Sequence, residues 1–520
     1  MTQGKRIVLN VVATYGRSLY GLALGLFTAR WVLMALGEVD FGLYGVVGGL
    51  TSFVIFINEL LAMSVARFFA VNVGAARKNE DEAAGMEECR KWFNTALLIH
   101  TTVPFALVIV GYPMGEWAVR HFLTIPPDRI YACVWVWRFT CLSCLVGMVN
   151  VPLRAMYTAK QEIAELTIYS FATSTLNAMM LYYMISHPAV WLQKYAFWSC
   201  LLSVIPNLII GYRAVVKYPE CRFVRNYLWD KRRMSEIASF AAARFFTSFS
   251  DILLSQGRQI IVNKYLGPSS NAAMRVGNGV AARSATLAGS LSGAFWPVVA
   301  NTVGTGDETR VRSMCFQICR LSTFLVAIFA VPLALESHEV LVLWLKNPPN
   351  FSAEICIFIL ISMLTNRLTE GYWMAVMGFG RRIPFYSWWI SWSGCIGFAV
   401  TWLLFASQIG MWSICYAILA DSLITLGMRM WLGKVIAQLS PLYWLRSVCL
   451  PLLALIVLTV AVGLVPRLML APSVLRIAVT ALCCELVLLP CAWKFVLIAD
   501  ERRYISDRLQ KVVKKFWPSH

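Results

Sequence analysis

The chain has 520 residues, of which 59% are hydrophobic and 14% charged, and its mean hydropathy is +0.64. This composition excludes a soluble globular protein and indicates a chain that lies mostly within a lipid bilayer. A net charge of +19 could indicate nucleic-acid binding. However, Lys and Arg are concentrated in every second connection between apolar segments, as in a membrane protein that fixes its orientation. We therefore expect no nucleic-acid partner.

Fourteen apolar segments are long enough to cross a bilayer, and each is predicted to be a helix because the bilayer core offers the backbone no water. They lie at 7–36, 39–74, 91–119, 130–158, 162–187, 189–216, 236–266, 270–303, 312–336, 349–377, 383–407, 409–433, 444–466 and 472–498. Basic connections alternate with connections poor in Lys and Arg, which predicts that both termini are cytoplasmic. The segments between the spans are too short for a separate folded domain.

A weak internal repeat relates the two halves of the chain. Shifting the sequence by 230 residues aligns Val32–Gly74 with Val262–Gly304, and nine of the 43 aligned positions are identical. The identities include a Leu-Gly pair at 36–37 and at 266–267, where we expect turns between spans. Internal repeats are a common plan among transporters, so we predict two related halves.

The segment at 237–304 carries the strongest functional signal. It consists of two membrane-length apolar runs broken at Gly267-Pro268, yet five ionic side chains lie within them. Arg244, Asp251 and Arg258 are spaced seven residues apart, which places them on one face of a helix. A charge at bilayer depth costs about 3 kcal/mol, so such side chains normally face a cavity lined by protein. We expect a polar seam along this helix.

Arginines exceed acids within the spans, which predicts a cationic cavity for an anionic ligand. The planar guanidinium is well suited to phosphate oxygens. For each arginine the alternative is structural pairing with a carboxylate, or a side chain that extends to the lipid headgroups. The predicted cavity residues are Arg17, Arg30, Arg138, Arg244, Arg258, Arg275, Arg283 and Arg367.

A few acids accompany these arginines, and a buried carboxylate could carry a proton across the membrane. The candidates for ion coupling are Asp251, Glu59 and Glu370. Glu370 follows Arg367 by three residues, so a local ion pair is the simpler interpretation there. Asp251 could likewise balance a neighbouring arginine.

The cysteines and histidines indicate neither a catalytic site nor a metal site. Cys141 and Cys144 form a CxxC pair, but no second pair accompanies it, so a structural role is favoured. His100 lies within a span, where we expect a buried, hydrogen-bonded imidazole. The GxxxG pair Gly45 and Gly49 predicts close helix packing. We expect no cofactor, no metal and no enzymatic activity.

Two regions of the sequence carry a family resemblance. The first is LGEVDFGLYGVVGGL at 36–50, followed by ARFFAVNVG at 66–74, and the second is SQGRQIIVNKYLGPSSNAAMRVGNGV at 255–280. Together they resemble the Wzx-type polysaccharide-biosynthesis flippases, a branch of the multidrug/oligosaccharidyl-lipid/polysaccharide (MOP) exporter superfamily. Arg275 departs from the family pattern, which places its arginine one residue earlier.

The resemblance implies an all-α membrane protein with about fourteen transmembrane helices, arranged as in the MATE-like members of the superfamily. Two pseudo-symmetric six-helix lobes are expected, followed by two C-terminal helices and a cytoplasmic amphipathic tail. The corresponding boundaries are 1–222 and 223–437 for the lobes, 438–499 for the last two helices and 500–520 for the tail.

The resemblance also implies a function. It implies translocation of an undecaprenyl-pyrophosphate-linked oligosaccharide, such as an O-antigen, capsule or exopolysaccharide repeat unit, across the bacterial cytoplasmic membrane by alternating access. Expected partners are this lipid-linked oligosaccharide, membrane lipids, and a polymerase with other polysaccharide-assembly proteins. The alternatives are a lipid II flippase, a MATE-like small-molecule antiporter and, more distantly, a membrane-embedded polymerase or acyltransferase, which the short outer connections disfavour.

Overall fold

The computed structural model describes residues 3–495, except 53, 59–60, 63–64, 66–67, 70–81, 161, 188, 190, 305–306 and 380–381. Within these residues all regular structure is helical. Nine of the described helices are long and apolar enough to cross a membrane, or ten when the bent pair Ser352–Arg367 and Glu370–Phe379 counts as one span. The predicted all-α, multi-pass membrane class is confirmed. The expected tail at 500–520 lies outside the described residues.

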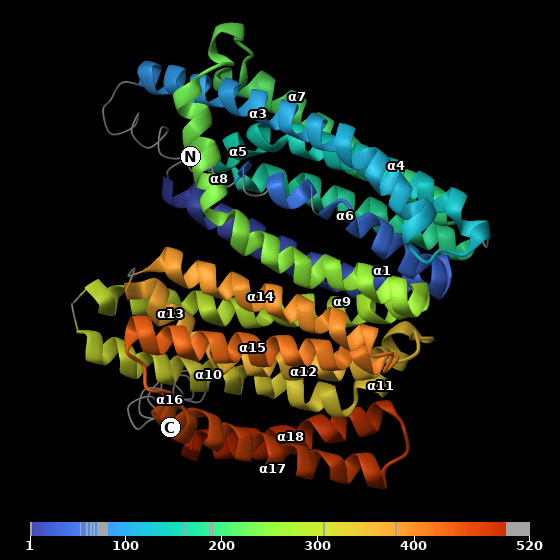
Figure 1. Ribbon diagram of the computed structural model, residues 1–520, viewed down its shortest axis with the longest axis vertical. Helices are drawn as coiled ribbons and strands as arrows, with labels where there is room; N and C mark the ends of the chain where they lie inside the picture. Colours follow the sequence, from blue (N-terminus) through green and yellow to red (C-terminus); the bar gives the residue numbers. More distant parts are fainter. Residues whose placement is uncertain are drawn as a thin grey trace, which may run out of the picture. The chain divides into compact units, whose positions relative to one another are not determined.

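Two compact units divide the chain, Met1–Arg275 and Val276–His520. In the first unit, α1 packs along α6, α4 packs along α7, and α3 packs against α4 (Figure 1). Its elements are α1 (Gln3–Gly49), α3 (Glu82–Trp117), η1 (Ala118–Phe122), η2 (Pro127–Arg129), α4 (Ile130–Val149), α5 (Val151–Ala159), α6 (Ile163–Ser186), α7 (Leu192–Lys217), η3 (Pro219–Cys221), η4 (Arg225–Tyr227), α8 (Lys231–Ile252), η5 (Leu253–Gly257) and the first part of α9 (Arg258–Gly304).

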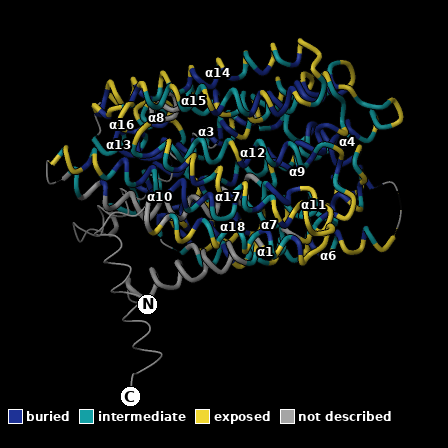
Figure 2. The backbone as a smooth tube through the Cα atoms, turned by 90° about the horizontal axis from the view of Figure 1, so that it is seen from below, coloured by how far each residue is buried: buried dark blue, intermediate teal, exposed yellow. Residues whose placement is uncertain are grey.

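The second unit continues from α9 with helices that also run side by side. Helix α14 packs along α15, and α17 packs along α18 (Figure 1). The elements are α10 (Glu308–Leu335), α11 (Ser337–Leu345), α12 (Ser352–Arg367), α13 (Glu370–Phe379), α14 (Ile383–Ala406), α15 (Trp412–Ala437), α16 (Pro441–Trp444), η6 (Leu445–Cys449), α17 (Leu450–Met469) and α18 (Val474–Phe495). Figure 2 shows exposed residues along α14, where Trp388 and Leu403 are 52% and 67% exposed, as expected of a surface that faces lipid.

Two glycines, 230 residues apart, bend the two longest helices at equivalent places. Gly37 interrupts α1 with φ 74° and ψ 172°, and Gly267 interrupts α9 with φ 81° and ψ −178°. Glycine has no Cβ and adopts positive φ at little cost, whereas other residues are strained there. The turns predicted at the two Leu-Gly pairs are therefore confirmed: at each of them two consecutive helices join at a single glycine, without a loop.

The part of α1 after the bend packs very closely on the segment at 256–275 of the same unit. A Cβ added at Gly42 would lie 2.0 Å from the carbonyl oxygen of Pro268, and one at Gly49 would lie 2.7 Å from Oε1 of Gln256. At Gly45 it would lie 3.2 Å from Cδ of Arg275. These distances confirm the close helix contact that the Gly45/Gly49 pair predicts.

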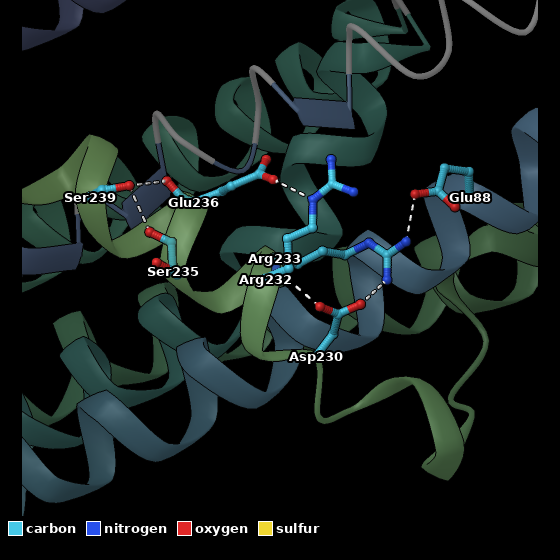
Figure 3. Close-up of polar contacts among 7 residues, drawn as sticks. All are labelled: Glu88, Asp230, Arg232, Arg233, Ser235, Glu236 and Ser239. Atoms are coloured by element: carbon cyan, nitrogen blue, oxygen red, sulfur yellow. Dashed lines mark hydrogen bonds and ion pairs between the residues drawn. The ribbon is translucent and has the colours of Figure 1, made fainter.

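The connection between α7 and α8 is folded against α3. The Asn94 side chain accepts the Val224 N–H at 2.8 Å and donates to the Arg222 carbonyl at 3.2 Å. Asp230 caps α8 by accepting the Arg233 N–H at 3.0 Å, and the Arg233 guanidinium reaches Glu88 at 2.6 Å (Figure 3). The connection between α7 and α8 is therefore held in place on the first unit by hydrogen bonds and an ion pair.

A buried ion pair fixes α18 to the end of α10 in the second unit. Arg476 donates to Oε2 of Glu336 through Nε at 3.2 Å and through a terminal nitrogen at 2.8 Å. The Thr480 hydroxyl donates to the other Glu336 oxygen at 2.9 Å. Arg476 is 6% exposed and Glu336 2%. The pair is nearly dry, and both carboxylate oxygens are hydrogen-bonded.

Candidate functional site

The predicted seam begins in α8 and continues through a π-helical turn, η5, into α9. Arg258 is the first residue of α9, directly after this turn, and only 8% of it is exposed. A π turn holds one residue more than a regular turn, so the seven-residue spacing is interrupted between Asp251 and Arg258. Asp251 accordingly lies exposed whereas Arg258 is buried. Such turns inside α-helices occur frequently at functional sites.

Arg275 is held by α1 through contacts that use its charge. Its guanidinium donates to the Phe41 carbonyl at 3.0 Å and lies over the rings of Phe41 and Tyr44, at 4.3 and 5.2 Å from their centroids. Stacking of this kind stabilises a buried cation without a carboxylate. The arrangement gives Arg275 a bracing role between α9 and α1 beside the two bends.

Two asparagines of the segment at 255–280 lie on either side of the bend in α9. Asn263 accepts the Thr124 N–H at 2.8 Å and donates to the Thr124 carbonyl at 3.3 Å. In the amide orientation that satisfies both of its polar atoms, Asn271 donates to the Gln259 carbonyl at 3.0 Å and accepts the Asn263 N–H at 3.2 Å. Asn271 therefore ties the part of α9 after Gly267 to the part before it, and Asn263 ties α9 to the connection between η1 and η2.

Two predicted cavity arginines form ion pairs with nearby acids. Arg367 lies 3.2 Å from Glu370, which confirms the predicted local pair and engages one of the candidate coupling acids. Arg138 lies 3.6 Å from Glu116 and 5.0 Å from the centroid of the Trp135 ring. These contacts are the structural alternative that the sequence left open for each arginine.

The remaining predicted site residues are spread along the chain. Arg30 is half-buried in α1. The side chains of Arg17, Arg244, Arg283 and Glu59 lie outside the described residues.

His100 shows how polar groups of the first unit are satisfied in the helical interior. It is fully buried on α3, and its Nδ1 lies 3.1 Å from Oδ1 of Asn58. The predicted buried, hydrogen-bonded imidazole is confirmed. Asn58 also lines a cavity, which places this pair at the edge of the polar region described next.

Two neighbouring cavities lie within the first unit. One, of about 570 Å³, is bounded by α4, α5, α6 and α7 together with Thr51, Ile55, Asn58 and Ala62. The other, of about 410 Å³, is bounded by α5, α6 and α7. Arg154 and Ser203 line both. Arg154 is the cation among the described lining residues, and no described lining residue is acidic. The described predicted arginines line neither cavity.

Arg154 is the residue that sequence reasoning missed. It lies four residues before the end of the predicted span at 130–158, where an arginine is expected to extend to the lipid headgroups. What distinguishes it is its setting. Helix α4 ends at Val149, Asn150 separates it from the short helix α5, and α5 places Arg154 beside α6 and α7. Nothing in the sequence around Arg154 indicates that the predicted span is divided into two helices.

Comparison with known proteins identifies the fold. No family model and no curated protein sequence matches the chain. A solved structure of the lipid II flippase MurJ, in an inward closed conformation, is similar to it with a TM-score of 0.69 and 14% identity, covering 94% of this chain and 98% of that one. An inward-facing multidrug resistance MATE family transporter of the MOP superfamily is similar with a TM-score of 0.59 and 13% identity, covering 81% and 94%. This chain has the fold that these two transport proteins share.

Proposed function

We propose that this protein is a flippase for an undecaprenyl-pyrophosphate-linked oligosaccharide, the repeat unit of an O-antigen, capsule or exopolysaccharide. It would move the glycan from the inner to the outer leaflet of the bacterial cytoplasmic membrane, with both termini in the cytoplasm. The observation that carries the proposal is the likeness to MurJ, which extends over nearly the full length of both chains. MurJ is named as a flippase of lipid II, a lipid-linked substrate.

The charges of the spans support an anionic substrate. Arg17, Arg244, Arg258 and Arg283 are proposed to meet the pyrophosphate, while the lipid tail stays in the bilayer. A sugar that crossed the hydrocarbon without polar contacts would lose its hydrogen bonds to water at a cost of several kcal/mol per group. A polar route through the protein removes that barrier. Arg30 is proposed to belong to the same route, and Arg138, Arg275 and Arg367 to its supporting contacts.

The energy source follows from the charge of the substrate. A membrane potential that is negative inside favours outward movement of an anion by about 2.3 kcal/mol per charge per 100 mV. The potential can therefore drive export through alternating access of the two halves. Asp251 and Glu59 are the proposed sites for a coupled ion, with Glu370 already engaged by Arg367.

Two related functions compete with this proposal. A lipid II flippase is favoured by the likeness to MurJ, whereas the resemblance at 36–50 and 255–280 favours the polysaccharide flippases. A MATE-like antiporter of cationic small molecules would require acids in its binding cavity. The described cavities are instead lined by Arg154 without a described acid.

The proposal is tested by leaflet accessibility in vesicles. Purified protein is reconstituted with a fluorescent polyprenyl-pyrophosphate-linked oligosaccharide, and a glycosidase that cannot cross the bilayer reports the accessible fraction. With protein, all of the glycan should become accessible; without protein, only the outer half should. Parallel vesicles with lipid II or with a cationic dye test the two alternatives. Movement of either alternative probe, with no movement of the oligosaccharide, would replace the proposal.

Arg258 provides a residue-level test. Arg258→Ala should abolish export while leaving membrane insertion and protein level unchanged. The matched control is Arg467→Ala, an exposed arginine in the last turn of α17. Export at the wild-type rate by Arg258→Ala would remove Arg258 from the proposed route.

A further inference from the structure

The connection between α7 and α8 exposes two aromatic side chains although its backbone is held on α3 (Figure 1). Trp229 is 75% exposed, more than any other Phe, Tyr or Trp among the described residues, and Phe223 is 62% exposed. Between them, the Tyr227 carbonyl accepts the Thr95 hydroxyl at 3.1 Å, and the Tyr227 hydroxyl donates to Glu87. The exposure of the two aromatics is therefore a property of the folded connection.

The acids in and next to this connection are already engaged in ion pairs. A paired carboxylate does little to neutralise other cations nearby, because its charge is balanced by its own partner. The pairs are Glu220 with Lys160 at 2.5 Å, Asp230 with Arg233, and Glu236 with Arg232 at 3.0 Å.

Three further cations of the connection have no such partner. Arg222, Arg225 and Lys231 are exposed, and none of them forms an ion pair with a described residue. They alternate along the chain with the two exposed aromatics, Phe223 and Trp229. We call these five residues the basic aromatic surface. It carries three positive charges together with apolar area that the protein leaves uncovered.

The position of the connection indicates what covers this surface. It directly follows α7, which is long and apolar enough to cross a membrane. The last turns of α7 expose Tyr212 and Val216 by 73% and 64%, as expected of a side that faces lipid. The chain therefore leaves the bilayer at a lipid-facing helix, next to the headgroup layer. Aromatic rings are enriched in that layer, and clusters of Lys and Arg bind anionic headgroups there.

We propose that the basic aromatic surface is an anchor for negatively charged phospholipid in the leaflet at this end of α7. Arg222, Arg225 and Lys231 contact the headgroup phosphates, and Phe223 and Trp229 lie at the boundary between headgroups and acyl chains. The charge of the three cations selects an anionic headgroup over a zwitterionic one, because only the anionic headgroup carries a net charge opposite to theirs.

Photo-crosslinking of the full-length protein in phosphatidylcholine nanodiscs tests the anchor. Trp229→p-benzoyl-phenylalanine places the crosslinker on the surface, and traces of fluorescent phosphatidylglycerol or phosphatidylcholine are the probes. The crosslinker at Tyr212 provides the reference for lipid contact within the span. The test variant combines Arg222→Gln, Arg225→Gln and Lys231→Gln.

A matched control removes the same charge elsewhere. It combines Lys346→Gln, Lys434→Gln and Arg467→Gln, which replace three exposed cations of the second unit. Phe223→Ala removes one of the aromatics without a change of charge. Thermal unfolding and gel filtration establish that each variant is folded.

At low salt, position 229 should crosslink phosphatidylglycerol at least fivefold more than phosphatidylcholine, since one cation near an anionic headgroup contributes about fivefold. The preference should fall to about onefold in the test variant, and also in about 1 M salt, where the Debye length is about 3 Å. The matched control should keep it. Phe223→Ala should lower the yield with both lipids alike, and position 212 should show no preference in any variant.

Two results would overturn the anchor. One is equal crosslinking of the two lipids at position 229, or a preference for phosphatidylglycerol that the test variant retains. The other is crosslinking in native membranes to a protein and to no lipid, which would assign the surface to a protein partner. None of these readouts depends on movement of an oligosaccharide, so the proposed function is tested separately.

Discussion

Arg476 and Arg154 compare two ways of placing a guanidinium among apolar helices. In the second unit, Arg476 faces Glu336 and Thr480 and is almost fully buried. In the first unit, Arg154 is exposed and lines two cavities that have no described acid in their lining. The two arginines thus differ in exposure. Arg476 is held in a buried ion pair, whereas the side chain of Arg154 reaches the surface of two cavities.

The largest expected effect lies in the buried pair. Arg476→Ala leaves the Glu336 carboxylate buried without its main partner, so we expect the free energy of unfolding to fall by about 3–5 kcal/mol. Thermal or chemical unfolding in detergent measures the change.

The double variant Arg476→Met with Glu336→Leu is its control. It removes both charges together, so most of the stability should return. A double variant as unstable as Arg476→Ala would mean that the two side chains stabilise the position of α18 through packing and not through their charges.

A second, smaller effect tests what the two halves share. Gly37→Ala and Gly267→Ala each force a side chain into positive φ, which should cost about 1–2 kcal/mol of stability per site. Neither position has an atom within 4 Å of an added Cβ, so the cost should come from the backbone alone. Equal losses in thermal unfolding would support equivalent turns, whereas a loss at one site only would show that the two bends differ in the backbone strain they impose.

The two bends are among the features that could be predicted from the sequence. The Leu-Gly identities at 36–37 and 266–267 predicted the turns, because a positive φ is a local property that selects glycine. The GxxxG pair and the Arg367–Glu370 pair were predicted for the same reason: each depends on residues a few positions apart.

The cavity of the first unit could not be predicted in this way. Arg154 and Ser203 line the same cavities because α5 packs beside α7, although the two residues are about fifty positions apart in the chain. The bracing role of Arg275 on Phe41 is likewise set by helix packing and not by spacing. The interruption of the seam by the π turn also carries no signal in the spacing of Arg244, Asp251 and Arg258.

An acid outside the membrane-spanning segments extends the comparison to the surface. The backbone N–H of Arg233 holds the pKa of Asp230 below its ordinary value. The cap therefore stabilises the protein above the unfolded pKa of about 3.9, and this contribution is lost as the pH falls through the lower, folded value. Asp230→Ala should cost about 1 kcal/mol at neutral pH.

Asp230→Asn separates the cap from the charge. It keeps an acceptor for the N–H but does not titrate, so its stability should change less with pH between about 5 and 3 than that of wild type. Unfolding followed across this range measures the difference, and identical pH profiles for Asp230→Asn and wild type would contradict the role of the Asp230 charge.

The smallest expected change in stability belongs to Arg154. It is exposed, so Arg154→Ala should leave the free energy of unfolding within about 0.5 kcal/mol of wild type. Set beside Arg476→Ala, this near-zero result is the sharpest test of the comparison. A loss as large as that of Arg476→Ala, measured under the same conditions, would assign Arg154 to the framework of the first unit.

The docking of the connection at 218–230 on α3 has a mechanical consequence. Asn94 binds two backbone groups of this connection, and Arg233 at the start of α8 pairs with Glu88. The start of α8 is therefore fixed to α3. Any tilt of α9 relative to α8 would then have to be taken up between the two helices. The π turn at Leu253–Gly257, whose hydrogen bonds differ from the regular α-helical pattern, is where such a bend would cost least.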